Sequence, residues 1–447
     1  MTVPNQALIS YAYDNANRLT LITQGTSIVQ FGYDTANRRT SLTLPNGILV
    51  EYAYDAASRV IGITYKQGGT TVLGNLTYEY DKAGNRTKIG GSFARTGIPQ
   101  NVATTSYDAA NRQLTFGDKT LTYDDNGNLQ SITDSNGTTL YSWNARNQLV
   151  GISGPSVNAS FVYDGIGRRE KKTINGSLTE FLYDGINPVQ ESSGAAVLAN
   201  ILSGPMIDEF LTRTDVVGGT TSNFLTAALG SPIAVADASG TAQTEYTYEP
   251  FGKATSAGGS NSSSYQYTGR ENDGTGLYYY RARYFEPSLQ RFISEDPILS
   301  AGRPDFPYLV PRMLGHPQEL NGYSYVSNNP VHFVDLYGLY LGSGSPNGNE
   351  WGGFTKQDWR CTAPMGYLDR RSSCTRQCCI FHDACFQEWG CNSSSVLSLH
   401  WFDPNPPPCT GCNMRALICF LDNFNKHDCS GFPCLLDNSG GNAKCCK

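Results

Sequence analysis

The residues best suited to chemistry lie in one short run, Cys378 to Cys385. Within these eight residues an imidazole, His382, is followed by a carboxylate, Asp383, among three cysteines. An imidazole can take a proton from a water molecule as a general base, and a carboxylate can hold a hard cation such as Ca²⁺. Neighbouring side chains on a helix point about 100° apart, so the two groups would serve different tasks.

A second cysteine-bounded run downstream could hold the first one in place. Cys378 and Cys385 are seven residues apart, and so are Cys412 and Cys419. If both runs are helical, this spacing is about two turns, or roughly 10 Å of axial rise. Two antiparallel helices could then be joined by bridges Cys378–Cys419 and Cys385–Cys412, which would fix the imidazole and the carboxylate at a rigid two-helix surface.

The cysteines also divide the chain. With 447 residues it is long enough for more than one domain, yet all 13 cysteines lie between Cys361 and Cys446. Such a density indicates a disulfide framework made for an oxidising compartment. A structural zinc site is less favoured, because the cysteines do not repeat a C-x-x-C spacing with matching histidines.

Charge and hydropathy exclude some functions. The net charge is −6, and residues 341–447 hold nine Lys/Arg and nine Asp/Glu, so no nucleic-acid partner is expected. No run approaches the length of a transmembrane span. Met1–Asn5 lacks the pattern of a signal peptide, which indicates either export by a route that needs none or the end of a longer chain.

A Tyr-Asp motif repeats along the first half of the chain. Its copies are Tyr13–Arg18, Tyr33–Arg38, Tyr54–Arg59, Tyr80–Arg86 and Tyr107–Arg112, with weaker copies from Tyr123, Trp143, Tyr163 and Tyr183. The period of about 20 residues indicates an array of one supersecondary unit.

Each repeat has the pattern of a β-hairpin. Alternating runs such as Leu19–Thr23 suit a strand with one buried face, and Asp-x-x-Asn/Gly suits the turn. The sequence therefore predicts successive antiparallel hairpins in one long sheet, with tyrosine rings packed on a pleated face and hydroxyls on polar partners. A structural role for the Tyr-Asp pairs is favoured over carbohydrate binding, because the pair recurs in every unit.

These repeats resemble those of Rhs and YD-repeat proteins. The resemblance covers about residues 10 to 340 and is strongest in five segments, Phe224–Pro232, Tyr246–Gly252, Tyr267–Glu271, Gly276–Tyr284 and Arg291–Pro297. It implies an all-β YD-repeat region at 1–223, an Rhs-associated core at 224–339, and a shell that encloses a variable C-terminal toxin.

The resemblance also implies that the core cuts its own chain. The pair that would cleave is Asp296 and Asp335, and the cut would fall between Leu339 and Tyr340. Two close carboxylates cannot both ionise easily, so one can act as a base and the other as an acid. Leu336 stands where relatives have proline, and extra residues separate the two motifs. A retained core that no longer cuts is the alternative.

After Leu339 the composition changes sharply. Residues 340–360 are rich in Gly, Ser and Asn, which is typical of a linker, and residues 361–447 hold the cysteines. The fold class expected for the whole chain is therefore multidomain, an all-β shell followed by a small disulfide-rich α-helical domain.

The cysteine-rich domain resembles secreted phospholipase A2. Cys378–Cys385 matches the family motif Cys-Cys-x-x-His-Asp-x-Cys in every fixed position. Cys412–Phe420 matches the facing-helix motif except at Asn413, where the family has Asp. The resemblance also places Cys361 near the family's calcium loop, where it could pair with Cys379.

The phospholipase resemblance implies roles for three residues. His382 would activate a water for attack on the sn-2 ester of a phospholipid, and Asp383 would hold a Ca²⁺ cofactor that polarises the ester carbonyl. Asn413 stands where the family has the aspartate that orients the histidine. Slower turnover is expected, or Asp422 or Asp428 stands in.

Together these observations predict a polymorphic toxin of the Rhs type carrying a calcium-dependent phospholipase A2. Its partners would be a phospholipid membrane as substrate, an immunity protein and secretion-system components. It would be secreted or held at the cell surface and delivered to a target cell. The alternatives are a catalytically inactive lipid- or receptor-binding module, supported by Asn413, and a surface adhesion protein whose tail is a cap.

Overall fold

The computed structural model describes residues 1–299 and 320–339. The chain divides into two compact units, Met1–Gly353 and Phe354–Lys447, and every described residue belongs to the first. The predicted linker and cysteine-rich domain therefore lie outside the described residues. No helix in the described part is long and apolar enough to cross a bilayer.

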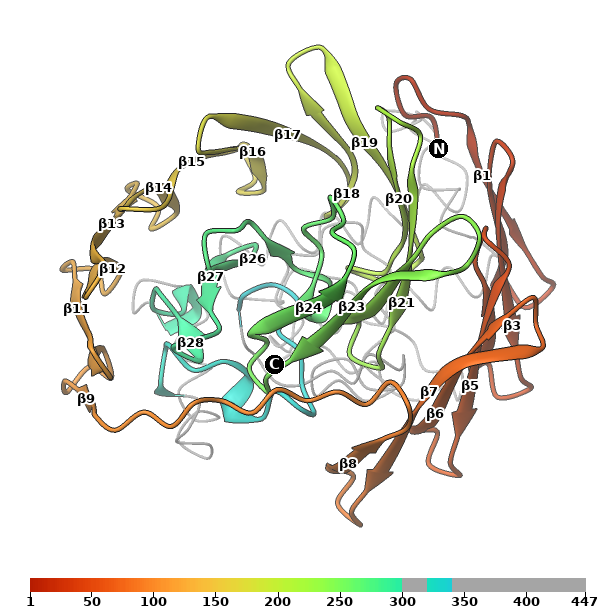
Figure 1. Cartoon of the computed structure of the whole chain (residues 1–447), viewed down its shortest axis with the longest axis horizontal. Helices are drawn as coiled ribbons and strands as arrows, with labels where there is room; N and C mark the ends of the chain where they lie inside the picture. Colours follow the sequence, from red (N-terminus) through yellow and green to blue (C-terminus); the bar gives the residue numbers. More distant parts are fainter. Residues whose placement is uncertain (300–319, 340–447) are drawn as a thin grey trace, which may run out of the picture. The chain divides into compact units, whose positions relative to one another are not determined.

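The described residues form three antiparallel sheets in which strands adjacent in sequence are hydrogen-bonded neighbours (Figure 1). The first sheet has eight strands, β1 (Ile9–Tyr13), β2 (Leu19–Gln24), β3 (Ser27–Tyr33), β4 (Arg39–Thr43), β5 (Ile48–Tyr54), β6 (Val60–Gln67), β7 (Thr71–Tyr80) and β8 (Arg86–Gly90).

The second sheet has 16 strands, β9 (Thr105–Tyr107), β10 (Gln113–Phe116), β11 (Lys119–Tyr123), β12 (Leu129–Asp134), β13 (Gly137–Trp143), β14 (Leu149–Ser153), β15 (Asn158–Tyr163), β16 (Arg169–Ile174), β17 (Ser177–Asp184), β18 (Asn187–Ser193), β19 (Ala196–Ser203), β20 (Phe210–Asp215), β21 (Thr221–Thr226), β22 (Pro232–Ala236), β23 (Ala242–Tyr248) and β24 (Ala254–Gly258). The boundary predicted between residues 223 and 224 falls inside β21 of this sheet.

The third sheet is small and lies late in the chain. Its strands are β25 (Glu271–Asn272), β26 (Tyr278–Tyr280), β27 (Arg283–Glu286) and β28 (Arg291–Phe292). Short 3₁₀ helices, η1 (Tyr267–Gly269), η2 (Pro297–Leu299) and η4 (Val326–Asn328), flank these strands. The all-β prediction for the repeat region is confirmed.

The repeat turns are built by the aspartate of the motif. Asp34 Oδ1 accepts hydrogen bonds from the backbone N–H groups of Ala36 and Arg38, each at 2.9 Å, and Oδ2 accepts from Arg38 Nε at 2.7 Å. Asn37 adopts a φ of 62°, in the left-handed region that asparagine tolerates. The predicted turn chemistry is therefore confirmed.

In five of the motifs the tyrosine links its strand to the preceding repeat. Tyr54 Oη donates to the carbonyl of Arg39 at 2.7 Å, while the Arg38 guanidinium lies 4.8 Å from the centre of its ring. In the repeat that carries tryptophan, Trp143 Nε1 donates to the carbonyl of Leu129 at 2.8 Å. The ladder therefore needs a ring with a polar tip at this position, as predicted.

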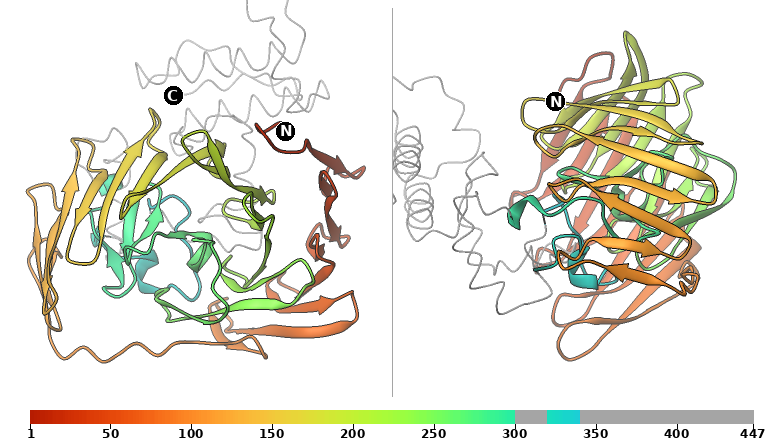
Figure 2. Two further views of the ribbon diagram at one scale, coloured as in Figure 1. Left: turned by 45° about the horizontal axis from the view of Figure 1, so that its top comes forward. Right: turned by 90° about the vertical axis from the view of Figure 1, so that its left-hand side faces the viewer.

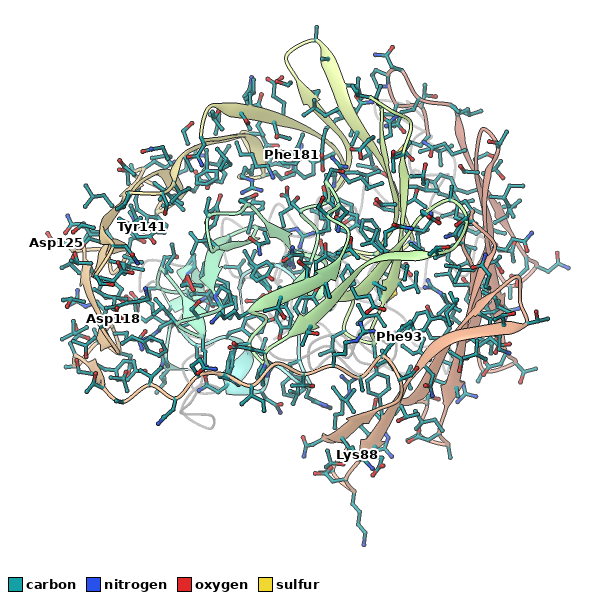
Figure 3. All side chains as sticks on the ribbon, in the orientation of Figure 1. Lys88, Phe93, Asp118, Asp125, Tyr141 and Phe181 are labelled. Atoms are coloured by element: carbon teal, nitrogen blue, oxygen red, sulfur yellow. The ribbon has the colours of Figure 1, made fainter. Side chains whose placement is uncertain are left out.

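The prediction of one continuous sheet is wrong, because the strand array breaks between β8 and β9. Gly91, at a φ of 101°, leaves no room for a Cβ beside the Asn75 carbonyl. Phe93 then turns inward and its ring centre lies 5.5 Å from that of Tyr65 (Figure 3). The inserted segment thus buries an aromatic ring where another ladder strand was expected.

The two large sheets share one hydrophobic core. Side chains from the first sheet, such as Val50 and Leu76, are in one buried cluster with Leu202 and Leu225 of the second. The other half of the second sheet packs against the small sheet, where Leu149 and its neighbours contact Leu277. The 16 strands thus curve around the small sheet (Figures 1 and 2), which positions the residues described next.

Candidate cleavage site

The site is built on an aromatic cluster between the small sheet and the returning segment 320–339. Tyr280, Phe285, Phe292 and Tyr325 are each at most 1% exposed, and the ring centres of Phe285 and Tyr325 are 4.6 Å apart. Burial raises the pKa of Tyr325 to about 12, so its hydroxyl stays neutral at neutral pH. The cluster anchors the segment that carries Asp335.

Asp296 and Asp335 meet at one guanidinium nitrogen. Arg283 Nη2 lies 2.8 Å from Asp296 Oδ2 and 3.3 Å from Asp335 Oδ2. All three residues are buried, with exposed fractions of 5%, 3% and 1% for Asp296, Asp335 and Arg283. The guanidinium plane lies over Phe292, 3.6 Å from the ring centre. The predicted carboxylate pair is thus brought together through an arginine.

Asp335 also binds the backbone of the residues that follow it, up to Leu339. Its Oδ1 accepts hydrogen bonds from the backbone N–H of Tyr337 at 3.2 Å and of Leu339 at 3.1 Å. Gly338, at a φ of 68°, passes so close to Tyr280 that a Cβ would collide with its carbonyl oxygen. The residue before the predicted cut is therefore fixed against one of the two predicted carboxylates.

Four successive carbonyl oxygens of this segment are held by donors of the core. Arg270 Nη2 donates to the carbonyls of Asp335 at 3.1 Å and Leu336 at 2.5 Å, and Arg281 Nη1 also donates to the Leu336 carbonyl. The next two carbonyls accept from the backbone N–H of residue 282 at 3.2 Å and from Arg283 Nε at 2.6 Å. The carbonyls of residues 335–338 are thus all paired, and the segment is held in a turn in which Asp335 Oδ1 accepts from the N–H groups of residues 337 and 339.

This arrangement places two buried carboxylates beside the segment that precedes the predicted cut. Two carboxylates can divide the roles of base and acid when one of them is protonated. Arg283 lies between the two carboxylates, and its other donors fix the backbone at the carbonyls of Gly322, 2.8 Å from Nη1, and Gly338. The site therefore combines a carboxylate pair, which can supply the acid and base of peptide hydrolysis, with a fixed substrate segment.

Sequence reasoning identified the carboxylates but not the three arginines that hold the segment. Arg270, Arg281 and Arg283 lie within the quoted motifs, and for Arg281 and Arg283 the signal was their position in an aromatic run, Gly276–Tyr284, that becomes largely buried. Tyr340, on the far side of the predicted cut, lies outside the described residues.

The residues predicted for the phospholipase also lie outside the described residues. They are His382, Asp383, Asn413 and the cysteines Cys361, Cys378, Cys379, Cys385, Cys412 and Cys419. Residues 1–299 and 320–339 contain no group of three or more His, Cys, Asp or Glu side chains arranged to hold a metal ion.

Comparison with known proteins identifies the described part of the chain. Residues 46–331 match the family described as Teneurin YD-shell, and residues 13–49 match the RHS repeat. The tRNA3(Ser)-specific nuclease WapA of Bacillus spizizenii is 30% identical over 275 residues, which cover 60% of this chain and 11% of the nuclease. Toxin subunit YenC1 of Yersinia entomophaga is 26% identical over 309 residues, covering 59% of this chain and 29% of the subunit.

A solved structure has the same fold. The crystal structure of TcdB2-TccC3-Cdc42 superposes with a TM-score of 0.53 at 21% identity, over 74% of this chain and 20% of that chain. This chain therefore spans between about a tenth and a third of the length of these relatives.

Proposed function

Because the chain belongs to the teneurin YD-shell family, we propose that it is a polymorphic toxin whose YD-repeat shell carries a C-terminal enzyme and releases it by cutting after Leu339. The observation that carries this proposal is the shared contact of Asp296 and Asp335 with Arg283, next to the Leu339 amide. Two of its relatives, a tRNA nuclease and a toxin subunit, agree with a toxin of this kind.

The cut would proceed by hydrolysis between Leu339 and Tyr340. One carboxylate of the pair takes a proton from water, and the water oxygen bonds to the Leu339 carbonyl carbon. The bond to the Tyr340 nitrogen then breaks, and the other carboxyl group supplies the proton that this nitrogen takes up. The donors on the carbonyls of residues 335–338 keep the segment in place while this happens.

The proposed enzyme is a phospholipase A2 formed by residues 361–447. Its His382 takes a proton from a water that attacks the sn-2 ester, and Asp383 holds Ca²⁺. The ion, when bound, supplies polarisation of the ester carbonyl. The phospholipid membrane of a target cell is the proposed substrate, and the equal numbers of acidic and basic residues in the tail give no support to a nucleic-acid substrate.

A liposome assay tests the enzyme. Release of free fatty acid from phospholipid vesicles is expected with Ca²⁺, and it should cease in EGTA and in His382→Gln. His400→Gln, a change at a tail histidine outside the motif, is the matched control and should keep full activity. Full activity in the chelator would remove the calcium mechanism.

Asn413 supports a second candidate, an inactive phospholipase-like module that binds lipid or a receptor. Asparagine can accept a hydrogen bond from the imidazole, but it cannot offset the charge of an imidazolium. The same vesicles separate the two functions, because the inactive module would sediment with them and release no fatty acid.

Mass spectrometry of the purified chain tests the cut. The proposal expects two fragments, one that ends at Leu339 and one that begins at Tyr340. A single intact species of 48.7 kDa, unchanged after prolonged incubation, would argue against self-cleavage and would leave the lipase assay to be judged separately.

A further inference from the structure

Asp208 lies far from the carboxylate pair in sequence but touches the residues that hold the segment before the cut. It lies between β19 and β20 of the 16-stranded sheet, is 8% exposed, and has a φ of 59°. Its backbone N–H donates to Asn187 Oδ1 at 3.0 Å, and Asn187 Nδ2 donates to the Met206 carbonyl at 3.0 Å. The turn that presents Asp208 is therefore fixed to the neighbouring strand.

The Asp208 carboxylate pairs with two guanidinium groups. Arg281 binds it through both terminal nitrogens, at 2.5 Å and 3.1 Å, and Arg270 Nη2 lies 3.0 Å from Oδ2. The core backbone approaches closely here, because a Cβ on Gly269 would lie 2.6 Å from the Asp208 carbonyl oxygen. The 16-stranded sheet and the region around the small sheet are thus in direct contact at this point.

The same two arginines both donate to the Leu336 carbonyl. Two cations on one carbonyl repel each other, and burial together with the charge of Arg281 lowers the pKa of Arg270. Asp208 offsets this repulsion by pairing with both. Without its charge, the two guanidinium groups would favour separating, and at least one would leave Leu336.

We propose that Asp208 is a positioning residue for residues 335–339, the segment before the cut. From its place in the 16-stranded sheet, it keeps Arg270 and Arg281 together on the Leu336 carbonyl. Residues 335–339 are then held in place only where the 16-stranded sheet and the small sheet are correctly assembled against each other. This inference rests on the proposed self-cleavage, because that is the reaction being positioned. It adds a dependence of the cut on a residue that does not touch the reacting atoms.

Hydrogen exchange measured by mass spectrometry tests the inference without requiring cleavage. Every sample is the full chain with Asp296→Asn, so that the peptide containing residues 335–339 can be compared in one covalent state. Adding Asp208→Asn is expected to raise exchange there by about tenfold or more, because the segment opens more easily. The matched control is Asp215→Asn, which removes a carboxylate 2.5 Å from Arg213 on the same strand β20 and should leave residues 335–339 unchanged.

A double variant separates charge balance from simple loss of structure. Arg281→Met added to Asp208→Asn removes the repelling cation and leaves Arg270 on the Leu336 carbonyl, so exchange should fall below that of Asp208→Asn alone. If Asp208→Asn loses its β-sheet circular dichroism signal, Arg281→Met by itself still tests whether the two arginines hold the Leu336 carbonyl, since it removes one of the two donors. It should then raise exchange at residues 335–339 only.

The inference is overturned if Asp208→Asn leaves exchange at 335–339 unchanged, or if Asp215→Asn raises it equally. With Asp296 intact, Asp208→Asn is also expected to slow appearance of the cleaved species by about tenfold or more, as misplacement of a reacting strand does. If the unmodified chain never cuts, the proposed function fails, while the exchange result still decides whether Asp208 positions the segment.

Discussion

The backbone N–H of Leu339 donates a hydrogen bond to Oδ1 of Asp335 at 3.1 Å. The residue before the predicted cut is thus bound by one of the carboxylates proposed to make the cut. The other oxygen of Asp335 lies 3.3 Å from Arg283 Nη2. One side chain therefore both orients the strand and belongs to the carboxylate pair.

Asp335→Asn should slow self-cleavage by about 100-fold or more, because the amide can still accept hydrogen bonds but cannot exchange a proton as a general acid or base. The measurement is the fraction of cut chain over time, by mass spectrometry. Asp164→Asn, at a repeat turn outside the site, is the control and should cut at the normal rate. Equal rates in the two variants would exclude Asp335 from the chemistry.

Arg283→Met should lower the free energy of unfolding by about 3–5 kcal/mol, because two buried carboxylates lose the cation they share. Urea denaturation measures the change. Arg59→Met is the control, since the Arg59–Asp55 pair is partly exposed and such pairs contribute about 1 kcal/mol or less. Adding Asp296→Asn and Asp335→Asn to Arg283→Met should recover part of the loss. An Arg283→Met protein as stable as Arg59→Met would contradict the shared contact.

The hairpin array was predictable because its determinants are local. The bonds that Asp34 makes to Ala36 and Arg38 span two and four residues, so the motif itself contains the turn. The break after β8 was not, because Phe93 is buried only when the two sheets pack together. A local pattern cannot show that a polar Gly-rich stretch carries a core side chain.

The site was predictable only in part for the same reason. The resemblance to a known core paired Asp296 with Asp335, and the structure brings both to Arg283. The contacts of Asp208 with Arg270 and Arg281 join segments 62 and 73 residues apart in sequence, and neither burial nor pairing at that distance has a periodic signal. Such long-range charge pairing emerges only from the assembled fold.

Trp143→Phe should destabilise the repeat sheet by about 1 kcal/mol or more, because the Leu129 carbonyl loses its bond from Nε1. Trp143→Tyr should lose less, since tyrosine hydroxyls make the equivalent bond in other repeats, as Tyr163 does with the Leu149 carbonyl at 2.6 Å. The midpoint of urea denaturation measures both. Equal losses in the two variants would show that ring volume, not the polar tip, matters here.

The acid sensitivity of the repeat turns should depend on their arginines. The hydrogen bond from the Arg18 side chain lowers the pKa of Asp14 below its ordinary value of 3.8. The folded-state pKa is lowered, so this carboxylate stabilises the fold above the ordinary pKa, and the contribution is lost as the pH falls through the lowered one. Arg18→Met should therefore move the pKa of Asp14 back up toward 3.8, as followed by NMR titration of its carboxyl carbon. The stability difference between Asp14→Asn and the unmodified chain should shrink in the same acid range, and an unchanged Asp14 pKa in Arg18→Met would show that the arginine does not stabilise the charged turn.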